Sequence, residues 1–166
     1  FRPGLEELMV KRLNRQKCID SGTLPNFDPL TLEIRESEWK ISPIPKEIHD
    51  RRVEITGPPD RKMVINAMNS GANVFMADFE DSLSPMWENL LQGQQNLYDA
   101  QRKVITYHHT TKGLYALNKD PAILFVRPRG LHLPEVHYVV DGEPCPGSLF
   151  DFGLYMWHNA AWLASQ

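Results

Sequence analysis

The segment that most constrains the fold runs from Ile123 to Gly130, where an apolar run of strand length ends in two arginines, a proline and a glycine. Side chains of a strand alternate between its two faces, so residues two apart share one face. If the strand geometry persists to its end, Arg127 and Arg129 project together. The pattern therefore predicts a buried strand that presents two guanidinium groups at its carboxyl end.

An earlier apolar run, Asn73–Ala77, ends in acids instead of arginines. By the same alternation, Asp78 and Glu80 are expected on a shared face, with Asp81 beside them. Buried strands that finish in charge are typical of α/β enzymes, whose active sites open at the carboxyl ends of the strands. The two runs together indicate a site where an anionic substrate meets arginine, with carboxylates nearby.

The chain after Arg52 alternates between strand and helix patterns. Val53–Thr56, Asn73–Ala77 and Ala122–Val126 read as strands, and each is followed by a helical pattern. The apolar middle of Asn73–Ala77 is what a strand covered on both faces would carry. This order implies parallel strand–helix–strand units. Three such units do not close a barrel of eight strands, so we expect an unpaired sheet edge.

Proline, glycine and serine mark the expected helix ends. Pro58 and Pro59 suit the first turn of one helix and Gly71 its C-terminal end, while Ser84-Pro85 suits the start of the next. Each helix also has apolar residues that are expected to face the core. In the first they are Met63, Val64, Ala67 and Met68, and in the second, whose helical propensity Gly93 lowers, they are Trp87, Leu90, Leu91, Leu97 and Tyr98. A final helix, with Ser148 as its expected N-cap, has Leu149, Phe152, Met156, Ala160 and Leu163 on one face.

Two hairpin signals interrupt this alternation. Leu114–Leu117 and Ala122–Val126 flank the turn-like Asn118–Asp120, so they are expected to pair with each other. Val136–Val140 followed by Asp141-Gly142 reads as a short strand and a turn.

Residues 1–50 are interpreted as a separate N-terminal helix and connector, and residues 51–166 as the α/β domain. Pro3–Ile19 has an apolar helical stripe that is expected to pack on a core, and Gly22 can end this helix. Thr23–Asp50 is rich in proline, so we expect an extended connector with only a strand-like patch at Leu32–Ile34.

Composition excludes several classes of protein. The chain has 166 residues, 42% of them hydrophobic, which is enough for one domain with a core. A formal net charge of −3 argues against a nucleic-acid partner, and the apolar runs are far shorter than the roughly 20 residues of a membrane span. Cys18 and Cys145 make no disulfide framework and fit a reducing compartment, so we expect a protein that is not secreted. The sequence also lacks zinc-ligand spacing and the G-x-G-x-x-G, P-loop and G-x-S-x-G motifs.

Each charged group has a structural alternative at this point. The two arginines could cap carbonyls or form structural ion pairs rather than bind a substrate. The acids Asp78, Glu80 and Asp81 suit Mg²⁺, which prefers oxygen ligands and keeps water molecules that outer carboxylates can hold. The same acids could form a solvated turn before the helix that starts near Ser84-Pro85.

Five segments carry a more specific signal because they occur in the order of one family: Val53–Pro58 (VEITGP), Asp60–Ala67 (DRKMVINA), Phe75–Ser82 (FMADFEDS), Phe125–Gly130 (FVRPRG) and Gly147–Gly153 (GSLFDFG). Together they resemble malate synthase of the isoform A type. The resemblance covers Arg52–Asn159 and extends more loosely over the N-terminal helix and connector.

The resemblance implies a (β/α)₈ TIM barrel preceded by an N-terminal helical segment, with the first few strand–helix units of the barrel in residues 51–166. It implies the glyoxylate-cycle reaction, in which acetyl-CoA condenses with glyoxylate and hydrolysis yields malate and CoA, with Mg²⁺ as cofactor. Arg127 matches the family's catalytic arginine, which stabilises the enolate-like charge formed from acetyl-CoA.

The remaining site residues are also implied by the resemblance. Asp78 and Glu80 match acids of the substrate and metal pocket that act through metal-bound water, with Asp81 next to them. Arg129 is expected to support the same pocket. No direct metal ligand is expected in this chain: the carboxylates that hold Mg²⁺, and the aspartate that exchanges protons with the acetyl methyl group, are expected beyond Gln166.

Because Phe1 is not methionine and the last residues still read as helix, we expect the chain to be part of a longer protein and to be inactive alone. The expected compartment is the peroxisome or glyoxysome in a eukaryote and the cytoplasm in a bacterium. Two alternatives stay open: a non-catalytic remnant that acts as a binding or interaction module, and another Mg²⁺-dependent barrel lyase.

Overall fold

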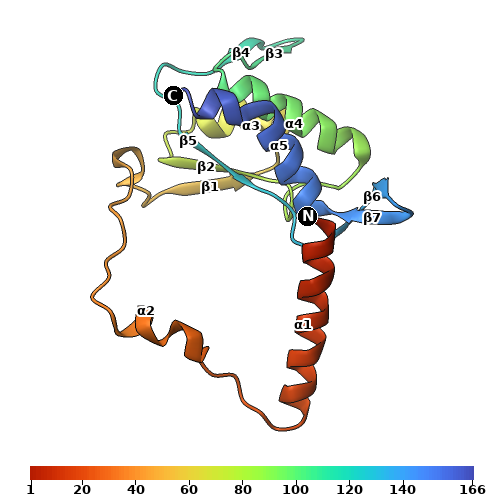
Figure 1. Cartoon of the computed structure of the whole chain (residues 1–166). Helices are drawn as coiled ribbons and strands as arrows, with labels where there is room; N and C mark the ends of the chain where they lie inside the picture. Colours follow the sequence, from red (N-terminus) through yellow and green to blue (C-terminus); the bar gives the residue numbers. More distant parts are fainter. The chain divides into compact units, whose positions relative to one another are not determined.

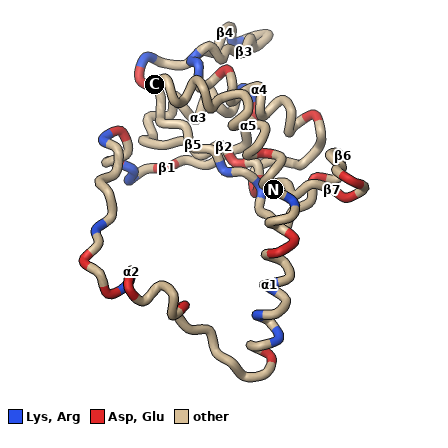
Figure 2. Tube along the Cα trace, in the orientation of Figure 1, with Lys and Arg blue, Asp and Glu red and all other residues tan.

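The structure is a computed structural model that describes all residues, Phe1–Gln166. The chain divides into two compact units, Phe1–Pro43 and Ile44–Gln166, and each is described by itself. Basic and acidic positions are interspersed along both units, and no long stretch carries one sign of charge alone (Figure 2).

The first unit consists of two helices joined by an irregular segment. Helix α1 spans Arg2–Asp20, and the chain turns just after it at Gly22, whose φ of +94° suits glycine. Leu8 and Leu13 of its expected apolar stripe are 59% and 62% exposed. The N-terminal helix is therefore present as expected, and none of its residues is buried within this unit.

The strand-like patch predicted at Leu32–Ile34 is wrong, because these residues are helical. Asp28 accepts a hydrogen bond from the backbone N–H of Leu30 at 2.9 Å and starts the 3₁₀ turn η1, Pro29–Thr31. The turn runs directly into the short helix α2, Leu32–Glu36. An aspartate followed by a proline is a helix start signal, and it overrode the β-propensity of the isoleucine.

The second unit is a mixed α/β structure built on three parallel strands. Strands β1 (Glu54–Gly57), β2 (Val74–Asp78) and β5 (Ile123–Arg127) lie side by side in that order. Helices α3 (Arg61–Met68), α4 (Trp87–Gln101) and α5 (Gly147–Leu163) follow the three strands along the chain. The 3₁₀ turn η2, Lys46–Ile48, precedes β1. The predicted alternation of parallel strands and helices is thus confirmed, with β1 and β5 as open edges of the sheet.

All three helices lie on one side of the sheet (Figure 1). One face of β2 is fully buried among the helices, through Phe75 and Ala77. Phe79, two residues further along the chain, is fully buried as well. The expectation that this strand is covered on both faces is confirmed in the main, because Val74 on its other face is also fully buried and Met76 is half-buried. The edge strand β1 differs, since its Glu54 and Thr56 are exposed. The core therefore lies between the sheet and the helices. No helix of the structure combines the length and the apolar character needed to cross a membrane.

Two predicted helix starts are displaced by a few residues. Helix α3 begins after Asp60, whose carboxylate accepts the Met63 N–H at 3.0 Å, so Pro58 and Pro59 precede the helix instead of forming its first turn. Helix α4 begins at Trp87 after Met86, which makes no side-chain cap. The pair Ser84-Pro85 thus lies in the loop, where the Ser84 carbonyl accepts a hydrogen bond from Met86 N–H.

The buried faces of the helices also differ in part from the prediction. In α3, Met63 is 44% exposed, whereas Ile65 is fully buried. Leu91 of α4 is 40% exposed. In α5, Phe152 is exposed and the buried residues are Gly147, Phe150, Asp151, Tyr155 and Asn159. The α5 face was mispredicted because its polar members, Asp151 and Asn159, are buried through hydrogen bonds that no apolar periodicity records.

Two antiparallel hairpins extend from the α/β unit. Strand β3 (Thr106–His109) pairs with β4 (Gly113–Ala116), so the predicted pairing of the β4 region with β5 is wrong. Strand β5 pairs with β2 instead, where its Leu124 and Val126 are partly buried against the core. The second hairpin joins β6 (Pro134–Val140) to β7 (Glu143–Pro146) through Asp141 and Gly142, both with positive φ, as predicted for this turn.

Candidate functional site

Asp78 and Arg127 are the last residues of two neighbouring parallel strands and stand opposite each other in the sheet register. The Arg127 Nε lies 3.3 Å from Asp78 Oδ1, so the pair forms a salt bridge. Asp78 is fully buried, whereas the Arg127 side chain is 35% exposed. The expected placement of both residues at the carboxyl ends of adjacent strands is confirmed, and it leaves the guanidinium accessible.

The chain after β2 folds back around the Asp78 carboxylate. Its Oδ1 accepts the backbone N–H groups of Glu80 at 2.9 Å and Asp81 at 3.2 Å, and its Oδ2 accepts the Ser82 hydroxyl at 3.0 Å. Aspartate commonly holds a turn in this way through the backbone two and three residues ahead. Glu80 is therefore carried by a turn and not by strand alternation, in contrast to the prediction.

This turn brings two further acids to Arg127. The Arg127 Nε lies 3.3 Å from Glu80 Oε2, and its Nη2 contacts the carboxylate of Asp81. The backbone N–H of Phe79 donates to the Arg127 carbonyl at 3.0 Å, which ties the turn to the end of β5. Three carboxylates around one guanidinium leave a formal charge of −2. Because the Arg127 side chain is 35% exposed, the group presents a cationic donor to solvent in an acidic setting.

Arg129 does not share this site, so the expectation that the two arginines project together is wrong. Strand β5 ends at Arg127, and the strand alternation does not reach Arg129. The Arg129 guanidinium makes two hydrogen bonds to Asp151 of α5, at 3.0 and 2.9 Å, and one to Glu135 of β6, at 2.8 Å. The backbone N–H of Arg129 also donates to Asp151, at 2.9 Å. All three side chains are almost completely buried.

Glu135 has a second partner at the surface. Its Oε1 accepts the backbone N–H of His137 at 2.8 Å and lies 2.7 Å from the ring Nδ1 of the same residue. Burial acts to raise the pKa of the Glu135 carboxyl, but the hydrogen bonds from His137 and Arg129 more than offset it and hold that pKa below its usual value. The pKa of Arg129 is raised, because the two carboxylates outweigh the opposing effect of burial.

The prediction from sequence missed Asp151 and Glu135. Asp151 was recoverable in principle, because it is the only acidic residue in the largely apolar segment Gly147–Leu163. An acid inside such a segment indicates a buried partner. Glu135 carries no comparable signal, since an acid at the start of a hairpin strand is ordinarily exposed.

The residues present do not form a direct metal site. No group of three or more His, Cys, Asp or Glu side chains is arranged to hold a metal ion. Both Asp78 oxygens are engaged by the turn, and Glu80 and Asp81 face Arg127. Mg²⁺ requires near-octahedral oxygen ligands, and this arrangement does not supply them.

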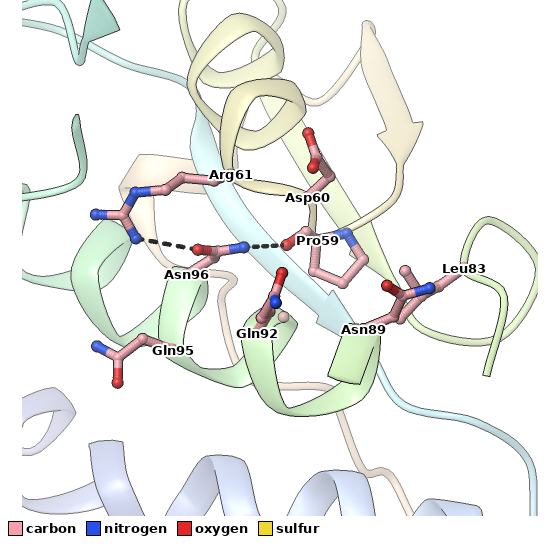
Figure 3. Close-up of a pocket in the computed structure, with 9 residues that line it drawn as sticks. Pro59, Asp60, Arg61, Leu83, Asn89, Gln92, Gln95 and Asn96 are labelled. Atoms are coloured by element: carbon pink, nitrogen blue, oxygen red, sulfur yellow. Dashed lines mark hydrogen bonds between the residues drawn. The ribbon is translucent and has the colours of Figure 1, made fainter. Parts of the chain in front are cut away.

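A separate pocket of about 290 Å³ lies between the start of α3 and helix α4. In Figure 3, Arg61, Asn96 and Pro59 are linked in a chain, with Arg61 donating to the Asn96 side chain at 3.0 Å and Asn96 donating to the Pro59 carbonyl at 2.9 Å. Arg61 also pairs with Asp99 at 2.8 Å. These polar groups are committed to one another, so they fasten α3 to α4, and none of the acids around Arg127 lines the pocket.

Comparison with known proteins gives a consistent result. The family model described as the malate synthase TIM barrel domain matches residues 123–166. A glyoxysomal malate synthase of Cucumis sativus is 56% identical over 162 residues, or 97% of this chain. A malate synthase of Oryza sativa is 57% identical over 97% of the chain, and one of Myxococcus xanthus is 56% identical over 92%.

These matches cover only part of the relatives. The chain spans 28%, 29% and 28% of the length of the cucumber, rice and Myxococcus proteins respectively. The aligned span takes in 97% of this chain in the cucumber and rice proteins, well beyond the residues that the family model matches. The chain is therefore similar, over nearly its whole length, to one part of these malate synthases.

Proposed function

We propose that the full-length protein containing this chain is a malate synthase, which condenses acetyl-CoA with glyoxylate and releases malate and CoA. The supporting observation is the identity of 54–57% to proteins named malate synthase, over nearly all of this chain. Because the chain spans less than a third of those relatives, the activity is proposed for the whole protein and not for these residues alone.

In this proposal Arg127 is the catalytic arginine. The aspartate expected beyond Gln166 takes a proton from the acetyl methyl group, which leaves an enolate on the thioester oxygen. The enolate carbon then attacks the aldehyde carbon of glyoxylate, and the alkoxide formed there takes up a proton to become a hydroxyl. Hydrolysis of the resulting thioester by water yields malate and CoA. The guanidinium of Arg127 donates to the enolate oxygen, where a fixed cationic donor stabilises charge that develops in the transition state.

The surrounding acids orient this donor. Asp78 holds both Arg127 and the turn, while Glu80 and Asp81 restrain the guanidinium from the other side. An arginine with its other nitrogens paired loses less rotational freedom when it binds the reacting oxygen, which is one way to pre-organise a site. Arg129 supports the same region from the buried side through Asp151 and Glu135.

The proposal also includes the cofactor and the remaining fold. Mg²⁺ would be held by residues in the part of the relatives that this chain does not span, and the acids around Arg127 would contact it through bound water. The strands β1, β2 and β5 would be the first units of a (β/α)₈ barrel in residues 51–166, following an N-terminal segment of residues 1–50. The acidic excess around Arg127 would favour a nearby divalent cation.

The proposed partners are acetyl-CoA and glyoxylate, with no nucleic acid and no membrane. For a eukaryotic protein we propose the peroxisome or glyoxysome, since several plant relatives are named glyoxysomal. For a bacterial protein we propose the cytoplasm.

A second candidate is a non-catalytic module that binds another protein chain. The observation that favours it is the open sheet: β1 and β5 each have one unpaired edge, and such edges accept a further strand. This candidate predicts binding without turnover.

Glyoxylate-dependent release of CoA from acetyl-CoA by the full-length protein tests the proposal, with a thiol reagent as the readout and omission of glyoxylate as the control. Arg127→Ala should lower kcat by about 10²–10³ and change KM much less, because it removes an interaction of the transition state. Absence of turnover in the wild type would overturn the function. Near-normal kcat in Arg127→Ala would overturn the role of this arginine.

A further inference from the structure

We infer that Asp151 is a positioning residue for Arg127, which acts by fixing the turn Pro128–Gly130 that follows it. The inference rests on the proposed function. Asp151 touches none of the acids around Arg127, and it lies on a different element, the first turns of α5. Its influence passes through Arg129, two residues along the chain from Arg127.

Asp151 holds Arg129 by both its backbone and its side chain. One carboxylate oxygen, Oδ2, accepts the backbone N–H at 2.9 Å and the guanidinium Nε at 3.0 Å, and the other, Oδ1, accepts Nη2 at 2.9 Å. A bidentate carboxylate–arginine pair fixes orientation as well as distance. Because the same carboxylate also holds the main chain, the path of the backbone just after Arg127 is set by α5.

The turn held in this way packs directly against the acids of Arg127. A Cβ atom added to Gly130 would lie 3.1 Å from Glu80 Oε1 and 2.5 Å from the His132 ring. On the other side, a Cβ atom on Gly147 would lie 3.0 Å from Arg129 Nε. The turn therefore lies close to the Glu80 carboxylate, and we expect a shift of the turn to disturb Glu80 and with it the salt bridge to Arg127.

The charge of the buried cluster supports a positioning role over a purely stabilising one. Two carboxylates, Asp151 and Glu135, are buried against the single guanidinium of Arg129, each with a side chain about 1% exposed. Removing ions from water is costly, and packed apolar residues commonly stabilise a core as well or better. Such a cluster provides defined geometry, which is what a donor aimed at a reacting oxygen requires.

The test is Asp151→Asn in the full-length protein, assayed with both substrates. Asparagine keeps the size of the side chain and one acceptor oxygen, but it places an amide donor against the Arg129 donors. We expect kcat to fall about 10- to 100-fold, the scale of a small misplacement in an active site, with both KM values within about threefold of wild type.

The double variant Asp151→Asn/Arg127→Ala separates positioning from general structural damage. If Asp151 acts through Arg127, adding Asp151→Asn to Arg127→Ala should lower kcat less than about threefold further, because the positioned group is already absent. If the two losses multiply, Asp151 acts independently of Arg127 and the inference is overturned.

Asp99→Asn is the matched control. Asp99 also pairs with an arginine, Arg61, at 2.8 Å, and its side chain is 17% exposed. This pair joins α4 to α3 and includes none of the residues around Arg127. The variant should keep kcat near wild type. If Asp151→Asn is as active as Asp99→Asn, the inference fails while the proposed function stands; a wild type without turnover fails the proposed function itself.

Should Asp151→Asn not fold, Glu135→Gln provides the second variant. Glutamine keeps an acceptor for Arg129 Nη1 and removes the charge on the other side of the same guanidinium. A loss of kcat that disappears in the Arg127→Ala background supports the inference. An unchanged kcat, or a loss that multiplies with that of Arg127→Ala, contradicts it.

Discussion

At the scale of residues, Arg127 and Arg129 illustrate how two identical side chains acquire different tasks from their partners. The Arg127 side chain is 35% exposed, whereas the Arg129 side chain is 3% exposed and bonded to two carboxylates. The first arrangement suits a donor for a reacting group, and the second suits a fixed point in the backbone. The difference arises from where β5 ends, since the residue after Arg127 is a proline that leaves the ladder.

The buried cluster predicts a loss of stability in acid. The folded protein holds the pKa of Glu135 below its ordinary value of 4.5, mainly through hydrogen bonds that overcome burial. Its carboxylate therefore adds stability above that value, and the contribution is lost as the pH falls through the lowered pKa. Thermal midpoints of the full-length protein between about pH 6 and pH 3 should fall more steeply for wild type than for Glu135→Gln.

Glu143→Gln provides the control for this measurement, because Glu143 is an exposed acid on the hairpin partner of β6. Its midpoints should follow those of wild type throughout the range. Parallel curves for wild type and Glu135→Gln would contradict the coupling of Glu135 to folding.

At the scale of elements, the helices are placed by a few close contacts with the loops at the carboxyl ends of the strands. Helix α4 carries Gly93 where it crosses Phe79 and Pro59, and Asn96 one turn later donates to the Pro59 carbonyl. Helix α5 begins against Arg129 and is held there by Asp151. In both cases the loop that carries functional groups is also the loop on which a helix docks.

Two glycines test this docking. A Cβ atom at Gly93 would lie 2.9 Å from both a Phe79 ring carbon and Pro59, whereas one at Gly153 of α5 meets no atom of this chain within 4 Å. Alanine is favoured over glycine in a helix by about 1 kcal/mol, so Gly153→Ala should stabilise the full-length protein by about 0.5–1 kcal/mol. Gly93→Ala should instead destabilise it by about 1–3 kcal/mol, because overpacking outweighs helix propensity.

Denaturation midpoints of the two variants, measured side by side, check the prediction. The pair controls for helix propensity, since each variant replaces a helical glycine with alanine. A stabilising Gly93→Ala would mean that α4 does not contact Phe79 as closely as the structure shows.

At the scale of the whole molecule, the second unit is a sheet of three strands with helices on one face and open edges at β1 and β5. Large apolar side chains are exposed on α5, among them Phe152 at 56% and Trp157 at 85%. Unpaired edges and exposed apolar faces favour association with other chains. The arrangement is typical of a piece that requires neighbours.

The isolated 166-residue chain is therefore expected to be poorly stable and catalytically inactive. It should bind a hydrophobic dye or aggregate, because its edges and the apolar residues of α5 lack partners. It should release no CoA from acetyl-CoA in the presence of glyoxylate. Size-exclusion chromatography, dye fluorescence and the CoA assay measure these outcomes. A monomeric chain that melts cooperatively and turns over would contradict both expectations.

The succession of strands and helices was determined by the sequence alone, because short apolar runs, glycines and prolines act over a few residues. Val53–Thr56, Asn73–Ala77 and Ala122–Val126 fall within one residue of the strands observed. The charged ends of the second and third strands are likewise visible in the sequence, which points to Asp78 and Arg127 together. Their registry follows from parallel pairing of neighbouring strands.

Only the tertiary structure decided which side chains each charge meets. Arg129 and Asp151 are 22 residues apart, and nothing local to either one identifies the other. Glu80 reaches Arg127 because the turn closes on Asp78. Strand β4 pairs with β3 and not with β5, because β5 forms a long-range parallel ladder with β2. Buried polar groups pair according to the tertiary structure, because each buried charge and hydrogen-bonding group has to be satisfied there. The pattern of residues along the sequence does not show these pairings.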